Sequence, residues 1–205
     1  MPAEHLSSGV TIDEELCSSW TSFHPSQVQI CAESPGEELS GTPRKVQTTG
    51  DQIHFFKPYR YCDTGVAKNE LKKYLQISAA SGLEGLLISR LSGLVRDDSG
   101  AVLGLLLSYI NSKALTLRCA VRPDTPLSSR NRWADQITNT LTSLHAAGII
   151  WGDAKPDNVL IDSNSDAWLI DFGGSYTEGW VEPELAETVK GDLQGLSRIL
   201  RYVFR

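Results

Sequence analysis

Residues 151–175 of this 205-residue chain read WGDAKPDNVLIDSNSDAWLIDFGGS, and they decide how the rest of the sequence is interpreted. The two short apolar runs at 159–161 and 167–170 are expected to be strands, because short apolar runs bounded by turn residues are typical of buried strands. Four polar side chains lie in the loops beside them: Asp153, Lys155, Asn158 and Asp171. These loops can therefore converge on one site.

The four residue types match the requirements of phosphoryl transfer. That reaction needs a base near the attacking hydroxyl, a cation for the developing charge, and oxygen ligands for Mg²⁺. A segment rich in Asp, Gly and Pro is more often a plain turn. A turn, however, does not require Lys155, Asn158 and a spaced Asp-Phe-Gly at 171–173 together, so we predict a site.

The pattern D-x-K-P-x-N followed by D-F-G resembles the catalytic and metal-binding loops of the eukaryotic protein kinase superfamily. The resemblance implies an α+β, kinase-like two-lobe fold, with a small antiparallel sheet plus helix C and a shortened helical large lobe. It implies ATP and Mg²⁺ as cofactors and transfer of the γ-phosphate of ATP to a hydroxyl. Asp153 would be the catalytic base and Lys155 the phosphate-contacting lysine of the serine/threonine branch. Asn158 and Asp171 would bind the metal and, through it, the nucleotide.

The resemblance also assigns residues outside the deciding stretch. Lys57 in HFFK matches the strand lysine that holds the nucleotide phosphates, and Glu70 matches its helix-C partner. A solvated strand-end lysine is the plain alternative for Lys57. Asp192 resembles the helix-F aspartate that braces the catalytic loop, although a helix cap would explain it as well. The remaining matches are the hinge residues Leu107, Ser108, Tyr109 and Ile110, and Pro183-Glu184 as the end of an A-P-E motif.

Hydrophobic periodicity predicts a sheet with one helix in the first half of the chain. Alternation favours strands at 26–32, 44–48 and 52–57, and helical spacing favours a helix at 66–78. The apolar runs 86–95 and 101–110 are joined by a turn and should form a hairpin that closes the sheet at five strands.

The second half is expected to be helical. One long helix should carry Trp133, Ile137, Leu141 and Leu144 and end at Gly148. A last helix should place Leu193, Leu196, Leu200 and Val203 on one face. We therefore divide the chain into an irregular lead-in at 1–25, a small nucleotide-binding lobe at 26–110 and a shortened helical lobe at 111–205.

Composition narrows the possible partners. The net charge of -6 argues against a protein that binds nucleic acid through its overall field. The longest apolar run, 101–110, is too short to span a bilayer, and the first residues lack a secretory signal. We expect an intracellular protein, cytoplasmic or nuclear, whose partners are ATP and a protein substrate or regulatory protein, with no nucleic acid and no membrane.

Several positions depart from the kinase pattern. Residues 33–44, ESPGEELSGTPR, stand in place of a glycine-rich loop, and Trp151-Gly152 replaces His-Arg before the catalytic Asp. The segment after Gly173 is short, and Arg205 lies inside the expected helix F. A pseudokinase or binding module without turnover is therefore one alternative. A small-molecule kinase of the aminoglycoside or choline type is another, since W-G-D resembles the H-G-D of those enzymes. Without that arginine, activity should not depend on phosphorylation at 175–177.

Overall fold

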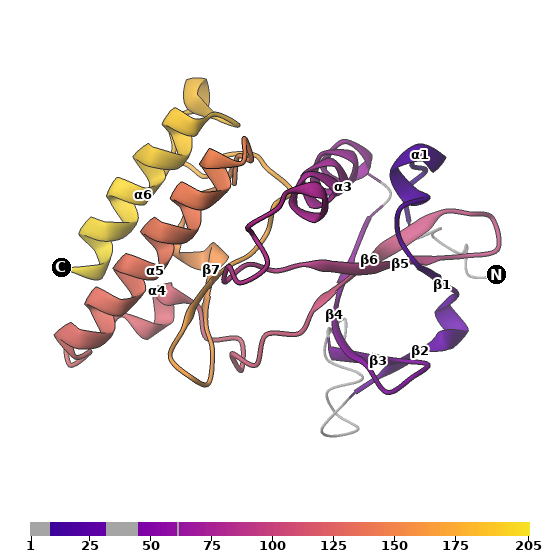
Figure 1. Cartoon of the computed structure of the whole chain (residues 1–205), viewed down its shortest axis with the longest axis horizontal. Helices are drawn as coiled ribbons and strands as arrows, with labels where there is room; N and C mark the ends of the chain where they lie inside the picture. Colours follow the sequence, from indigo (N-terminus) through magenta and orange to yellow (C-terminus); the bar gives the residue numbers. More distant parts are fainter. Residues whose placement is uncertain (1–8, 32–44, 61) are drawn as a thin grey trace, which may run out of the picture. The chain divides into compact units, whose positions relative to one another are not determined.

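The structure, a computed structural model, describes residues 9–31, 45–60 and 62–205. The chain divides into two compact units. Unit 1 comprises residues 1–68 and 90–109, and unit 2 comprises residues 69–89 and 110–205. Helix α3 (Thr64–Ala79), predicted from its helical spacing, begins in unit 1 and continues into unit 2 (Figure 1).

Unit 1 is built on a six-stranded sheet in the order β1-β5-β6-β4-β3-β2. All neighbouring strands are antiparallel except β1 and β5, which are parallel. Buried Val46, Val95 and Leu106 form one core cluster of this sheet, against which partly buried aromatic and aliphatic side chains pack. The strands are β1 (Ser22–Phe23), β2 (Val28–Ile30), β3 (Lys45–Thr48), β4 (Ile53–Pro58), β5 (Leu91–Arg96) and β6 (Val102–Ser108).

The predicted meander and hairpin are confirmed, with differences in strand bounds and in strand number: the strand expected at 26–32 is Val28–Ile30, and residues 26 and 27 belong to a 3-10 turn. The sheet has six strands instead of five, because β1 adds to the edge of β5. The hairpin strand begins at Leu91, not at residue 86, because the preceding backbone pairs elsewhere. Ser89 N donates to Leu169 O at 2.9 Å, and Leu169 N donates to Leu87 O at 2.9 Å.

The described part of the expected irregular lead-in, residues 9–25, is structured. It contains α1 (Glu14–Cys17) as well as β1, and a 3-10 turn, η1 (Pro25–Gln27), follows. Val10 exchanges two backbone hydrogen bonds with Val102, and the Val10 and Cys17 side chains are buried. This segment is therefore part of unit 1, a correction to the sequence-based expectation.

Unit 2 is mainly helical. Its helices are α4 (Leu117–Ala120), α5 (Leu127–Ala146) and α6 (Val189–Val203), with 3-10 turns η2 (Pro156–Asn158) and η3 (Pro183–Leu185). The predicted short strands are β7 (Val159–Ile161) and β8 (Ala167–Leu169), which pair as an antiparallel hairpin. Helix α5 buries its predicted face of Trp133, Ile137, Leu141 and Leu144. Gly148 follows its end with φ 73°, a conformation that favours glycine.

Helices α5 and α6 lie side by side within unit 2 (Figure 1). The guanidinium of Arg130 on α5 donates to the main-chain oxygen of Val203 at the end of α6. The buried face of α6 includes Leu196 and Val203 as predicted, but Leu193 is 50% exposed, so its assignment to that face was wrong. The buried position in that turn belongs to Asp192 instead.

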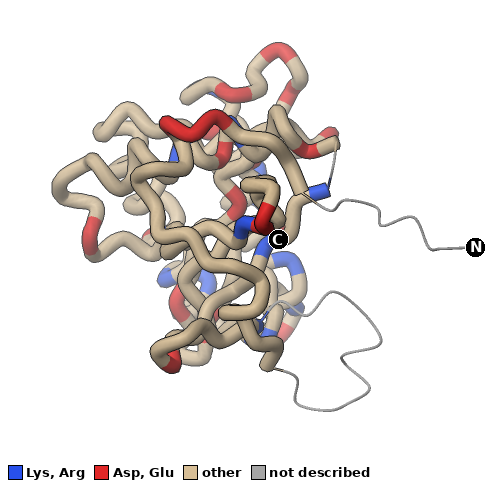
Figure 2. The backbone as a smooth tube through the Cα atoms, turned by 90° about the vertical axis from the view of Figure 1, so that its right-hand side faces the viewer, with Lys and Arg blue, Asp and Glu red and all other residues tan. Residues whose placement is uncertain are grey.

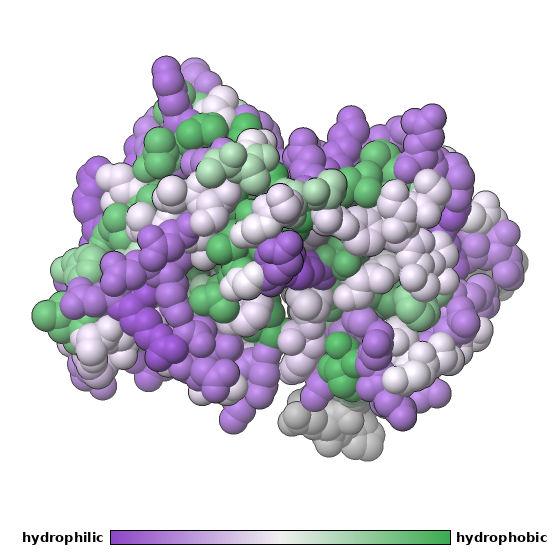
Figure 3. Space-filling view, viewed as in Figure 1, coloured by the Kyte–Doolittle hydropathy of each residue, from purple (hydrophilic) through white to green (hydrophobic). Residues whose placement is uncertain are grey.

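The described surface is polar in the main. Hydrophilic residues cover much of the visible surface, and hydrophobic residues show there as separate patches (Figure 3). Basic and acidic residues are spread along the described backbone without a long run of one sign (Figure 2). Among the helices of the described residues, none is long and apolar enough to cross a membrane.

Candidate active site

The β7–β8 hairpin positions the loops that carry the predicted site residues. Asn158 stands immediately before β7, and Ile170 stands immediately after β8. Ile170 N donates to Asn158 O at 3.0 Å, which continues the hairpin pairing one step beyond Val159 and Leu169. Asp171 is therefore the residue directly after one that is hydrogen-bonded to Asn158.

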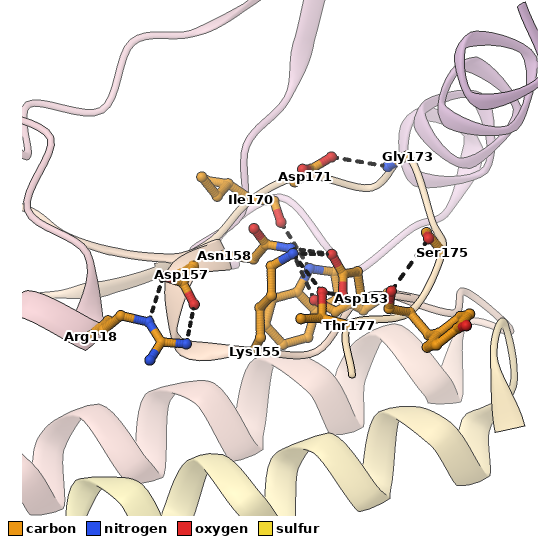
Figure 4. A network of polar contacts seen from close by, with 12 residues as sticks. Arg118, Asp153, Lys155, Asp157, Asn158, Ile170, Asp171, Gly173, Ser175 and Thr177 are labelled. Carbon is orange, nitrogen blue, oxygen red and sulfur yellow. Dashed lines mark hydrogen bonds and ion pairs between the residues drawn. The ribbon is translucent and has the colours of Figure 1, made fainter. Parts of the chain in front are cut away.

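Asp153 lies at the centre of a polar network in unit 2 (Figure 4). Its Oδ2 atom accepts from Lys155 Nζ at 2.5 Å and from Asn158 Nδ2 at 3.1 Å. Its Oδ1 atom accepts from the Thr177 hydroxyl at 2.8 Å. The carboxylate is buried, with 7% of the residue exposed. The structure thus brings together Asp153, Lys155 and Asn158, three of the residues predicted from the sequence.

Thr177 is a site residue that sequence reasoning missed. Its hydroxyl accepts from Lys155 Nζ at 2.8 Å while it donates to Asp153. The sequence offered it only as one of three hydroxyl-bearing residues after Gly173. An alcohol group therefore already donates a hydrogen bond to the Asp153 carboxylate in this structure. The carboxylate can thus accept a hydrogen bond from a hydroxyl.

Asp171 has a left-handed backbone, with φ 62°. Such a conformation is uncommon for residues other than glycine and is held only where the surroundings fix it. The next residue, Phe172, is fully buried, and its ring meets Tyr74 of α3 edge-on with centroids 5.7 Å apart. The Tyr74 hydroxyl in turn lies 2.9 Å from the Ser89 hydroxyl oxygen. The Asp-Phe-Gly segment is therefore packed against α3.

Two acidic groups lie close to Tyr74. Burial raises the pKa of Tyr74 well above 10.0, and the negative charges of Glu70 and Asp171 raise it further. Glu70 is itself completely buried on α3. Glu70 and Asp171 therefore share one region of unit 2, around the Tyr74 side chain.

The donor set formed by Asn158 and Asp171 fits magnesium. The Asn158 amide nitrogen donates to Asp153 O at 3.0 Å and to Asp153 Oδ2, so its oxygen is the end left for a cation. Mg²⁺ prefers oxygen ligands and takes many of them from water and phosphates. Within the described residues there is no group of three or more His, Cys, Asp or Glu that could hold a metal.

Asp192 ties α6 to residues 151–158, the predicted catalytic loop, which is called the catalytic loop below. Its Oδ2 accepts from Trp151 N and its Oδ1 from Gly152 N, both at 2.8 Å. His145 Nε2 lies 2.8 Å from Oδ2, and Asp192 is 1% exposed. The helix cap is Thr188, whose hydroxyl accepts from Gly191 N. Asp192 therefore braces the loop, as the sequence suggested, and does not act as a cap.

An ion pair holds the other end of the loop. Arg118 of α4 donates to both carboxylate oxygens of Asp157 at 2.6 Å (Figure 4). This contact with Arg118 holds the pKa of Asp157 below its usual 3.8. The Arg118 guanidinium also lies 5.5 Å from the centre of the Trp180 ring. The loop is therefore anchored by one acidic group from α6 and one basic group from α4.

The remaining predicted residues divide between the units. Lys57 lies on β4 opposite Leu105, and Leu107 and Ser108 end β6, where Ser108 N donates to Arg90 O at 2.8 Å. Lys57, Leu107, Ser108 and Tyr109 belong to unit 1, whereas Glu70, Ile110, Asn158 and Asp171 belong to unit 2. Their assignment to one nucleotide site stays a prediction. The segment in place of the glycine-rich loop, residues 33–44, lies outside the described residues.

The sequence matches the protein kinase domain over residues 66–191, more than half of the chain. It is 34% identical over 84 residues to a probable cAMP-dependent protein kinase catalytic subunit of Encephalitozoon cuniculi, covering 40% of this chain and 26% of that protein. It is 41% identical over 44 residues to the serine/threonine-protein kinase PKH3 of Eremothecium gossypii, covering 22% and 6%. It is 40% identical over 50 residues to the serine/threonine-protein kinase SKS1 of Saccharomyces cerevisiae, covering 24% and 10%.

The α+β fold and the domain match define a protein kinase-like domain. The chain belongs to the protein kinase family. It spans about a quarter or less of the length of these curated relatives.

Proposed function

We propose that this protein transfers the γ-phosphate of ATP to a serine or threonine hydroxyl of a protein, with Mg²⁺ as the metal. The observation that carries the proposal is the network around Asp153, in which one carboxylate contacts a lysine, an amide and a hydroxyl at 2.5–3.1 Å. A pure binding module has no need of this combination.

Asp153 would accept the proton of the attacking hydroxyl. Its Oδ1 atom already accepts from the Thr177 hydroxyl, so a substrate hydroxyl that replaced or joined Thr177 would meet an acceptor of the right kind. The two donors on Oδ2 orient the carboxylate and leave Oδ1 facing Thr177. Asp153 is thus held in a fixed direction before the substrate arrives.

Lys155 would stabilise negative charge on the transferred phosphoryl group. Its ammonium bridges Asp153 and Thr177, so it lies beside the expected position of the hydroxyl. The Mg²⁺–ATP complex supplies the phosphoryl group and neutralises part of its charge. Asn158 and Asp171 would hold that metal through their side-chain oxygens, and Lys57, Glu70 and residues 107–110 would bind the nucleotide.

Turnover measurements with radiolabelled ATP and Mg²⁺ test the proposal. The acceptors are dephosphorylated casein and histone in one arm, and choline and an aminoglycoside in the other. Asp153→Asn keeps the side-chain shape but removes the base, so turnover should fall by about 10²–10⁴-fold. Asp171→Ala should abolish the magnesium dependence of ATP binding.

Asp135→Asn is the matched control, because it makes the same chemical change on the exposed side of α5, outside the Asp153 network. It should leave turnover within about twofold. Transfer only to the small molecules would replace the protein-kinase proposal with the small-molecule one. No transfer at all, with Mg²⁺–ATP still bound, would favour the module without turnover.

A further inference from the structure

A carboxylate in unit 2 joins three segments that are far apart in the sequence. Glu187 Oε2 accepts from Lys73 Nζ at 2.7 Å. Its Oε1 accepts from Ser175 N at 2.7 Å and from Asn69 Nδ2 at 3.4 Å. Asn69 and Lys73 belong to α3, whereas Ser175 follows the Asp-Phe-Gly segment. We call this group of four residues the Glu187 anchor.

Lys73 is buried, with 7% of its side chain exposed. Besides Glu187, its ammonium contacts Trp151 O at 3.2 Å, directly before the catalytic loop. An ammonium removed from water is costly unless it is paired and hydrogen-bonded. Its burial therefore depends on Glu187, whose side chain is 36% exposed.

The backbone around the anchor leaves space for these side chains. Gly174 has φ 78°, and a Cβ atom there would lie 1.7 Å from Glu187 Oε1. Gly152 has φ 98°, and a Cβ atom there would lie 2.6 Å from Lys73 Nζ. Any larger residue at either position would displace the ion pair. Glu187 itself has a left-handed backbone with φ 53°, which aims its side chain into this space.

A second contact makes the same connection. Asn69 Nδ2 also donates to Gly173 O at 3.1 Å, so α3 contacts the Asp-Phe-Gly segment directly as well as through Glu187. Every donor in the anchor thus comes from α3 or from the residues just after Asp171. The one acceptor comes from the segment before α6.

We propose that Glu187 is a positioning residue, a carboxylate of the chain itself that holds α3, the segment after Asp171 and the start of the catalytic loop in one arrangement. The inference rests on the proposed function for its effect on turnover. Because the anion is part of the chain, this arrangement needs no added phosphate. A phosphate on exposed Ser175 would place negative charge beside the Glu187 carboxylate and weaken the anchor.

The first test is hydrogen–deuterium exchange of the full chain, which does not depend on turnover. Glu187→Gln should make the backbone amides of residues 173–177 exchange at least about fivefold faster, while those of α5 stay unchanged. The matched control is Glu182→Gln, which breaks an ion pair with Arg198 in the same segment, where the Glu182 side chain is 52% exposed. It should leave the exchange at 173–177 unchanged.

The second test separates positioning from simple stability. In the ATP-turnover assay, Lys73→Met and Glu187→Gln should each lower kcat by about 10- to 100-fold, since small displacements of reacting groups have effects of this size. The double variant should be no worse than the worse single variant, because both substitutions remove the same pair. If the two residues acted independently, the two fold-losses in kcat would multiply in the double variant, and that result would overturn the proposal.

Ser175→Asp provides a variant that does not risk the fold, because it alters an exposed side chain. It should accelerate exchange at 173–177 and lower kcat, while Ser163→Asp, another exposed serine, should do neither. If exchange and kcat are unchanged in Glu187→Gln and Ser175→Asp while the wild type turns over ATP, the anchor is wrong and the proposed function stands. If the wild type shows no turnover but exchange responds as expected, the proposed function fails and the anchor stands.

Discussion

Replacing Asp192 should destabilise unit 2 more than any ordinary surface substitution. Asp192→Ala removes the acceptor for two buried main-chain donors, Trp151 N and Gly152 N. A buried donor left without a partner costs about 1–3 kcal/mol, so the two together cost about 2–6 kcal/mol. The His145 ring loses its partner as well, which adds to this cost.

Asp192→Asn should cost about half as much, about 1–3 kcal/mol, because one side-chain oxygen remains and one main-chain donor keeps its partner. Urea unfolding followed by far-UV circular dichroism measures the difference. With a slope of about 2 kcal/mol/M, a loss of about 4 kcal/mol moves the midpoint by about 2 M. The control is Asp135→Ala on the exposed side of α5, with a change within about 0.5 kcal/mol.

Equal midpoints for Asp192→Ala and Asp135→Ala would refute this reasoning. The result would mean that Trp151 N and Gly152 N find other partners, and that Asp192 does not brace the loop. A larger loss of stability in Asp192→Asn than in Asp192→Ala would also contradict it, because Asp192→Asn removes fewer hydrogen bonds.

Three further outcomes follow from single sites. Burial lowers the pKa of His54 below 6.5, so the folded state resists protonation of this ring and loses stability relative to the unfolded state as pH falls below 6.5. His54→Leu removes this loss, so the stability that it gains in urea unfolding should grow as pH is lowered from 7.5 to 5. Arg118→Gln should lower the free energy of unfolding by about 0.5 kcal/mol at pH 7. This cost should shrink only as pH falls below 3.8, because Arg118 holds the pKa of Asp157 below that value in the folded state and the ion pair is lost when Asp157 becomes protonated. Gly195→Ala should cost about 1–3 kcal/mol in thermal unfolding, because its Cβ would lie 2.6 Å from the catalytic-loop backbone, whereas Gly65→Ala, with open space around it, should be neutral or stabilising.

The sequence predicted the elements whose apolar spacing is regular. Helices α3 and α5 and the β7–β8 hairpin follow from side-chain periodicity, which reflects local geometry. Strand β1 was not predicted, because two residues are too few to show an alternating pattern. Its parallel pairing with β5 also joins residues 22 and 94, which are far apart in the sequence. Leu193 was wrongly assigned to the buried face of α6, because helical spacing shows where the apolar face lies but not how many neighbouring positions it buries.

The site was predictable where its residues are close in sequence. Asp153, Lys155 and Asn158 fall within six positions, so one motif contains them and the structure joins them. Thr177 and Glu187 carry no such signal. Their contacts with Lys155 and Lys73 span 22 and 114 positions, and only the folded chain shows them.

The departure at Gly152 and the Glu187 anchor are two aspects of one arrangement. Where the kinase pattern has an arginine, this chain has a glycine, and its missing side chain leaves the space that Lys73 Nζ fills from α3. The backbone of Gly152, at φ 98°, also lets its N–H and that of Trp151 reach the same Asp192 carboxylate. The cation beside the catalytic loop is therefore supplied by a helix instead of by the loop itself. Its partner, Glu187, is carried by the chain, which is why we expect turnover without phosphorylation at 175–177.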